Sequence, residues 1–114
     1  MDDLTNDAKF LITTMYKQYV ELRKDKVDKV KATNFGSEIT IKDNLMPEWS
    51  ISDVHETLAE LYKNEFITAM FGDNQFIIVK ISTKAISQLE VSFGDRLNAV
   101  IEYIAKIKSA IPFI

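Results

Sequence analysis

His55 is the single histidine of the chain, and histidine is the side chain best suited to exchange a proton near neutral pH. A histidine that acts as a catalytic base needs a nucleophile or a metal beside it, and no serine here stands in a nucleophile-elbow motif. Glu56 follows directly, but consecutive residues of a helix point about 100° apart, so these two side chains do not act together. We therefore predict an exposed histidine without a catalytic role and a chain that is not an enzyme.

Carboxylates offer the second kind of chemistry. Glu56 and Glu60 lie four residues apart and would share one helix face, with Asp53 close by. Calcium usually demands a loop of oxygen ligands, and a chain with one histidine and no cysteine cannot build a multi-histidine or thiolate site. The sequence also lacks a glycine-rich phosphate-binding loop. These carboxylates could form a weak cation site, but the sequence favours an acidic surface that faces a partner or water, and we expect no metal and no cofactor.

Length and composition limit the kinds of fold that could position these residues. The chain has 114 residues, of which 46% are hydrophobic and 27% charged, so we predict one domain over residues 1–114. No stretch approaches the roughly 20 apolar residues that cross a bilayer, and Met1-Asp2-Asp3 lacks the basic start of a signal peptide. The absence of cysteine is typical of a reducing compartment. We expect a cytoplasmic protein with no membrane segment.

Charge is distributed unevenly around a net value of −3. Residues 37–65 carry seven acidic and two basic side chains, a net charge of −5, whereas residues 1–36 have a net charge of +1. The cations of this first third cluster at the end of the first predicted helix and just after it. They could form a flank that contacts phosphates, or an ordinary solvated surface of mixed charge. The cluster consists of Lys17, Arg23, Lys24, Lys26, Lys29 and Lys31.

Helical periodicity dominates the first part of the chain. Apolar residues at spacings of three and four predict an N-terminal helix within residues 1–24. Residues 28–35 are expected to form a short second helix that directs Val30 and Phe35 inward and stops at Gly36. Both helices would have to bury their apolar stripes against elements that come later in the chain.

A helix-turn-helix is predicted over residues 37–64. Its first helix would start at Ser37, although the β-branched residues that follow would also suit a strand. The second helix has the strongest local signals, with Ser50 as its N-cap and a hydrophobic staple formed by Trp49 and Val54. The apolar members expected in the first helix are Ile39, Ile41 and Leu45.

Two β-rich runs within residues 66–81 predict a two-stranded hairpin, turning at Gly72-Asp73-Asn74. A helix then starts at Ser82 or Thr83, and Asp95 is expected to start the last helix, residues 95–111. The apolar ridge of the last helix could pack on the first helix or pair across a two-fold axis. The chain ends in the apolar run Ile111-Pro112-Phe113-Ile114. The ridge residues that could mediate dimerisation are Leu97, Val100, Ile101, Ile104, Ile107 and Ile111.

This order of elements resembles a winged helix-turn-helix domain, an α+β fold that is mainly α, with a two-stranded wing and flanking N- and C-terminal helices. The resemblance is carried by the run V-x-x-x-L-x-x-L-x-x-x-E-F-I at residues 54–67, by the hairpin, and by residues 81–89. The last stretch looks like the segment after the wing in regulators of the MarR and PadR kinds. Residues 34–54 are also similar to small uncharacterised proteins of prophages and integrative elements in low-GC Gram-positive bacteria.

The resemblance implies a small DNA-binding regulator or accessory protein of a prophage or other mobile element, and it favours a homodimer. In such domains, the capped helix lies in the major groove of double-stranded DNA and the tip of the hairpin touches backbone phosphates. Mapped onto this chain, the candidate nucleic-acid contacts come from the basic segment, the helix-turn-helix and the hairpin tip. They are Lys24, Lys26, Lys29, Lys31, Lys42, Ser52, His55, Lys63 and Asn74.

The charge of the capped helix departs from this pattern. Asp53, Glu56 and Glu60 stand there against Lys63, and the hairpin tip has no basic residue. Affinity for DNA depends on cations that neutralise phosphates and release counterions. The alternative is therefore a winged-helix adaptor that binds no DNA and docks a basic protein partner on its acidic helix, residues 50–64.

Overall fold

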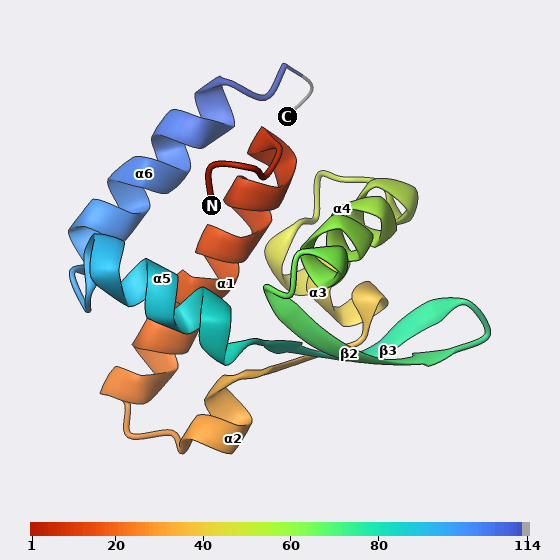
Figure 1. Cartoon of the computed structure of the whole chain (residues 1–114), viewed down its shortest axis with the longest axis horizontal. Helices are drawn as coiled ribbons and strands as arrows, with labels where there is room; N and C mark the ends of the chain where they lie inside the picture. Colours follow the sequence, from red (N-terminus) through yellow and green to blue (C-terminus); the bar gives the residue numbers. More distant parts are fainter. Residues whose placement is uncertain (113–114) are drawn as a thin grey trace.

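Helix α1 (Asn6–Lys24) occupies the centre of the molecule (Figure 1). The computed structural model describes residues 1–112, and within them six helices and one antiparallel sheet of three strands are formed. Helices α5 and α6 lie on one side of α1, and α3 and α4 lie on the other (Figure 1). The remaining elements are α2 (Lys29–Ala32), β1 (Asn34–Gly36), α3 (Glu38–Leu45), α4 (Ile51–Lys63), β2 (Ile67–Gly72), β3 (Gln75–Ile81), α5 (Thr83–Phe93) and α6 (Leu97–Ser109).

Helices α1, α3, α4 and α5 each follow a serine or threonine that caps their first turn. The hydroxyls of Thr5, Ser37, Ser50 and Ser82 each accept a hydrogen bond from the backbone N–H three residues on. Helix α6 is the exception, since it starts at Leu97 and its N-cap makes no side-chain hydrogen bond. The prediction that α6 starts at Asp95 was therefore two residues too early.

Strand β1 replaces the C-terminal part of the helix predicted over residues 28–35. Helix α2 has only four residues, and Val30 is 72% exposed, so its predicted inward direction was wrong. Phe35 is buried as predicted, but it reaches the core from an extended strand. Asn34 pairs with Lys80 of β3, and this pairing makes β3 the central strand. The sheet therefore has one strand more than the predicted hairpin.

The helix predicted from Ser37 forms, but only part of its apolar set is inside. Ile41 of α3 is buried, whereas Ile39, another apolar member of the predicted helix, is 53% exposed. Residues two apart on a helix point in nearly opposite directions, so one of the two isoleucines has to face solvent.

The hairpin of β2 and β3 turns where the sequence predicts. Asp73 and Asn74 both have positive φ, 52° and 62°, as the two central positions of a type I′ turn require. Beyond the turn, Phe71 pairs with Phe76 but Met70 pairs with Ile78, so the register shifts by one residue. This bulge bends the hairpin and increases its twist.

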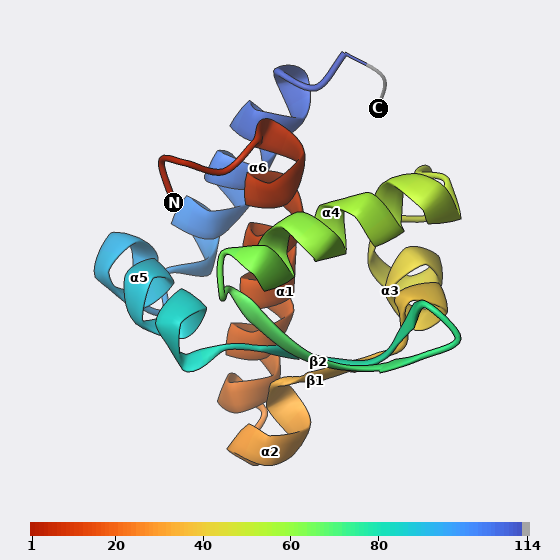
Figure 2. The same ribbon diagram turned by 45° about the vertical axis from the view of Figure 1, so that its right-hand side comes forward.

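Helix α6 packs against α1 within the same chain (Figure 2). Val100 is fully buried between the helices, Leu97, Ile104 and Ile107 are half-buried, and Ile111 is 9% exposed. Ile101 is 47% exposed and points away from the core. The ridge thus completes the core of one chain, and its use in dimerisation stays a prediction. Of the apolar chain end, Phe113 and Ile114 lie outside the described residues.

Tyr16 joins α1 to the connection between α5 and α6. Its buried hydroxyl donates a hydrogen bond to the carbonyl of Gly94, which adopts a φ of 57° there. Burial, together with the nearby charges of Glu90 and Asp95, raises the pKa of Tyr16 to about 12. Within residues 1–112, none of the helices is both long enough and apolar enough to cross a membrane.

Thr13 provides a test of packing in the core. It is fully buried, and within residues 1–112 its hydroxyl has no hydrogen-bond partner. We expect Thr13→Val to raise the free energy of unfolding by about 1 kcal/mol, because an unpaired buried hydroxyl is costly and valine keeps the shape. Urea unfolding measures the change.

Thr14 is the matched control, since its hydroxyl donates to the carbonyl of Phe10 at 2.7 Å. Thr14→Val should give no gain. An equal gain in both variants would show that the effect comes from general hydrophobicity and not from the unpaired hydroxyl of Thr13.

Candidate functional site

A buried carboxylate holds the hairpin against the helices. The side chain of Glu38, at the start of α3, is 6% exposed. Its Oε1 accepts a hydrogen bond from the backbone N–H of Phe76 at 2.8 Å and lies 2.9 Å from Nδ1 of His55. We call these three residues the Glu38 bridge; it connects α3, β3 and α4.

The Glu38 bridge provides a hydrogen-bond partner for β3 beyond the end of strand β1. Strand β1 pairs with β3 only at Val79 and Lys80, so the N–H of Phe76 lies beyond its reach. A buried N–H without a partner costs about 1–3 kcal/mol, and the Glu38 carboxylate supplies that partner. Sequence reasoning missed Glu38, because an acidic residue in the first turn of a helix is normally a solvent-exposed partner of the helix dipole.

His55 is half-buried and was wrongly expected to be an exposed residue. Its side chain is 34% exposed, and its ring lies edge-on to Phe76 with 5.2 Å between the ring centroids. The contact with Glu38 and the packing on Phe76 give this histidine a structural position between α4 and the hairpin. No catalytic role was predicted for it, and that prediction remains untested.

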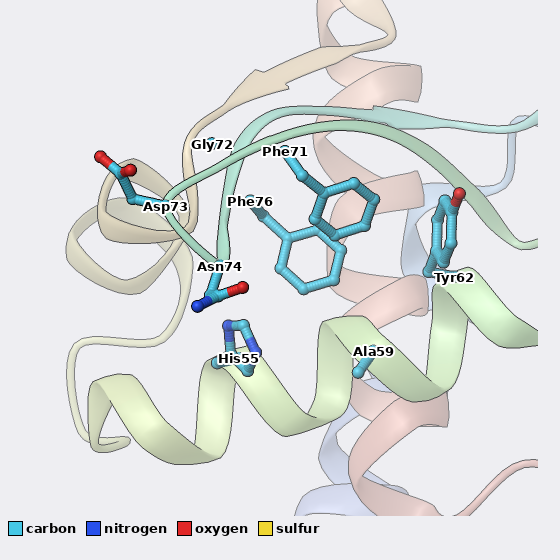
Figure 3. Close-up of a pocket in the computed structure, with 8 residues that line it drawn as sticks. All are labelled: His55, Ala59, Tyr62, Phe71, Gly72, Asp73, Asn74 and Phe76. Atoms are coloured by element: carbon cyan, nitrogen blue, oxygen red, sulfur yellow. The ribbon is translucent and has the colours of Figure 1, made fainter.

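A groove opens between the outer side of α4 and the hairpin that arches over it (Figure 3). Its volume is about 550 Å³. Phe71 lies 4.7 Å from Phe76 and 5.1 Å from Tyr62, measured between ring centroids, and the rings are tilted or edge-on to one another. Phe71 is 51% exposed and Tyr62 is 44% exposed, so both rings remain accessible. We call this the aromatic groove; it is lined by His55, Ala59, Tyr62, Phe71, Gly72, Asp73, Asn74 and Phe76.

Carboxylates gather beside the aromatic groove. A shallow hollow of about 500 Å³ on the same helix is lined by Asp7, Glu56 and Glu60, with Lys63 as a cation on its wall. Glu60 is engaged in the fold, because its carboxylate accepts hydrogen bonds from the backbone N–H and the hydroxyl of Thr5 at 2.8 and 2.6 Å. We call Asp7, Asp53, Glu56 and Glu60 the acidic rim.

The acidic rim influences the ionisation of its own members. Burial, and then the charges of Asp53 and Glu60, raise the pKa of Asp7 above its ordinary value. A negative potential that disfavours a further carboxylate favours a cation at the same place.

The predicted nucleic-acid contacts do not form one surface. Ser52, His55 and Lys63 lie on α4, and Asn74 lines the aromatic groove at the hairpin turn. Lys42 lies on α3 and donates to the carbonyl of Pro47 at 3.4 Å. The four other candidates lie at the end of α1 and around α2, across the sheet from α4 in both views (Figure 1 and Figure 2). They are Lys24, Lys26, Lys29 and Lys31, and all four are exposed.

Metal ligands do not gather in the part of the chain that the structure describes, where no cluster of three or more His, Cys, Asp or Glu side chains could hold an ion. Comparisons with models of protein families, with curated proteins and with solved structures find no match for this chain. The geometry of α4 and the hairpin therefore has to carry any functional conclusion.

Removing the Glu38 carboxylate tests the bridge. Glu38→Ala leaves the N–H of Phe76 and the His55 ring without their partner, so we expect the free energy of unfolding to fall by about 2–4 kcal/mol. Amide hydrogen exchange at Phe76 should accelerate in the same variant. Glu56→Ala, an exposed change on α4, should stay within about 0.5 kcal/mol. Unchanged exchange at Phe76 would contradict the bridge.

The charges of the acidic rim predict how the pKa of Asp7 responds to a substitution nearby. We expect Asp53→Asn to lower the pKa of Asp7 towards its ordinary value, because one of the charges that raise it is gone. When the pKa of a carboxyl is raised in the folded state, the free energy of unfolding of the protein falls as pH rises through that pKa. This fall should be smaller in the variant. Carbon NMR of the carboxyl group follows the titration. Asp43→Asn on α3 is the control and should leave Asp7 unchanged.

Proposed function

We propose that this chain is a winged-helix domain that acts as a protein–protein adaptor, docking a cationic protein segment on helix α4 and the β2–β3 hairpin. The observation that carries this proposal is the aromatic groove bordered by the acidic rim. Accessible aromatic rings supply the apolar contact area on which binding energy concentrates, and neighbouring carboxylates select a partner of opposite charge. The role requires no catalytic group.

The winged-helix assignment is supported by how the elements follow one another. Helices α3 and α4 form a pair joined by a short turn, and the hairpin follows α4 directly and packs over it (Figure 1). Strand β1 precedes this pair and joins the hairpin in one antiparallel sheet. The hairpin therefore stands beside the exposed side of α4 as a wing would.

Charge favours a protein partner over DNA at this face. Residues 52–63 and 71–76 together carry four carboxylates and one lysine, a net charge of −3. Phosphate contacts need cations, and each neutralised phosphate adds affinity through counterion release. The exposed lysines around α2 could not join such a contact, since they lie across the sheet from α4 (Figure 2). DNA binding, a regulatory role and a link to a mobile element therefore stay predictions of the resemblance.

Two probes separate the adaptor from the DNA-binding protein. The first is a short amphipathic peptide of leucine and lysine, and the second is a mixed-sequence DNA duplex at low salt. We expect the peptide to bind, and Phe71→Ala to weaken it by about tenfold, because an accessible ring at the centre of the groove is lost. Isothermal titration calorimetry measures the affinity of the protein for the peptide, and a mobility-shift assay tests whether the protein binds the duplex.

Met70 supplies the matched control. It precedes Phe71 on the same strand, is 62% exposed, and lies against a different hollow with Asn34 and Ile78. Met70→Ala should change peptide binding by less than about twofold. The same peptide with glutamate in place of lysine should not bind. Retardation of the duplex together with equal effects of the two substitutions on the peptide would overturn the adaptor proposal.

A further inference from the structure

The cationic segment that fits the aromatic groove is present on the chain itself. Resting on the proposed function, we infer that the groove takes residues 23–31 of a second copy of this chain, so that copies associate head to tail. We call residues 23–31 the basic corner; it comprises the end of α1, the connection and most of α2.

The basic corner has the charge that the groove lacks. Its five cations stand against two carboxylates, which leaves a net charge of +3 opposite the −3 of the groove face. One of the carboxylates, Asp28, is already used as the N-cap of α2, where it accepts from the N–H of Lys31 at 2.9 Å. The cations are Arg23, Lys24, Lys26, Lys29 and Lys31.

The basic corner also has an apolar anchor of suitable size. Val30 is 72% exposed and stands between Lys29 and Lys31 at the tip of α2. Nothing in the packing of the single chain requires a valine there, since Ala32 provides the buried contact of this short helix. A valine with a lysine on each side places one aliphatic group between two cations.

Complementary contacts follow from the chemistry of the two faces. Val30 can lie in the groove against the exposed parts of the Phe71 and Tyr62 rings, which contact each other edge-on. Lys29 and Lys31 point about 100° to either side of Val30 on α2, so their ammonium groups can reach carboxylates that border the groove while the valine occupies it. Such contacts combine an apolar anchor with screened ion pairs, so association should weaken in salt.

The positions of the two faces decide the geometry of assembly. Helix α2 of the basic corner and helix α4 of the groove lie on opposite sides of the sheet (Figure 1 and Figure 2). In a two-fold pair, each copy would have to present its groove and its basic corner to the partner on the same side. The two faces point to different sides of the molecule, so a two-fold pair cannot make both contacts at once. A head-to-tail contact leaves one groove and one corner free, so it continues to a further copy.

The test uses two variants of the full chain and their mixture. The groove variant carries Phe71→Ala and Glu56→Lys, and the corner variant carries Val30→Asp and Lys29→Glu. Sedimentation velocity should show that the wild-type mass rises with concentration and falls again in added salt, whereas each variant alone stays monomeric. The mixture should form a 1:1 complex and no larger species, since it contains one intact groove and one intact corner.

A surface control accompanies the variants. Val91 on α5 is 86% exposed and Lys106 on α6 is exposed, so Val91→Asp with Lys106→Glu repeats the chemical change away from both faces. This control should associate as the wild type does. Circular dichroism and thermal unfolding establish that every variant is folded.

Several results would overturn the inference. A wild type that stays monomeric at every concentration would do so, and peptide binding in the groove would then leave the adaptor proposal intact with a different partner. Variants that associate alone, or a mixture that forms no complex, would also overturn it. If Ile101→Asp abolishes association and the groove and corner changes leave it unaffected, the contact between copies is made by the ridge of α6.

Discussion

The carboxylate of Glu38 is the group on which the arrangement of α3, α4 and the hairpin depends. It is almost fully removed from solvent, so its charge has to be met by donors inside the protein. The N–H of Phe76 and the ring of His55 meet it, and they come from the hairpin and from α4. Without this contact the hairpin would be held by the pairing of β3 with the short strand β1 and by apolar packing on α4, which is not directional.

The shape of the aromatic groove follows from this constraint. With Phe76 held by its own backbone, the bulge between β2 and β3 places Phe71 beside it, and both rings are edge-on to Tyr62 of α4 (Figure 3). A Cβ at Gly72 would lie 2.2 Å from the end of the half-exposed Ile77 side chain, so a larger residue there would require that side chain to move. Phe71 and Tyr62 remain about half exposed at this contact, whereas Phe76 is buried beneath them.

Electrostatics divides the surface into two unlike faces. The outer side of α4 collects carboxylates, which add to the effect of burial in raising the pKa of Asp7, while the corner around α2 collects lysines. The net charge of the chain is only −3, but the groove face has a net charge of −3 and the basic corner a net charge of +3. Such a separation steers the choice and orientation of a partner more than it adds to affinity.

Local signals in the sequence determined where α3, α4 and α5 begin and where the hairpin turns. Ser37, Ser50 and Ser82 cap their helices because a hydroxyl satisfies a free N–H within the same turn, and Asp73-Asn74 tolerates the positive φ of a tight turn. Such interactions span a few residues and can be read from spacing alone. Only the tertiary structure decided that residues 34–36 form a strand, that Glu38 is buried and that His55 is its partner. These outcomes depend on atoms separated by 17 or more positions in the chain, and no local pattern encodes which of those groups will meet.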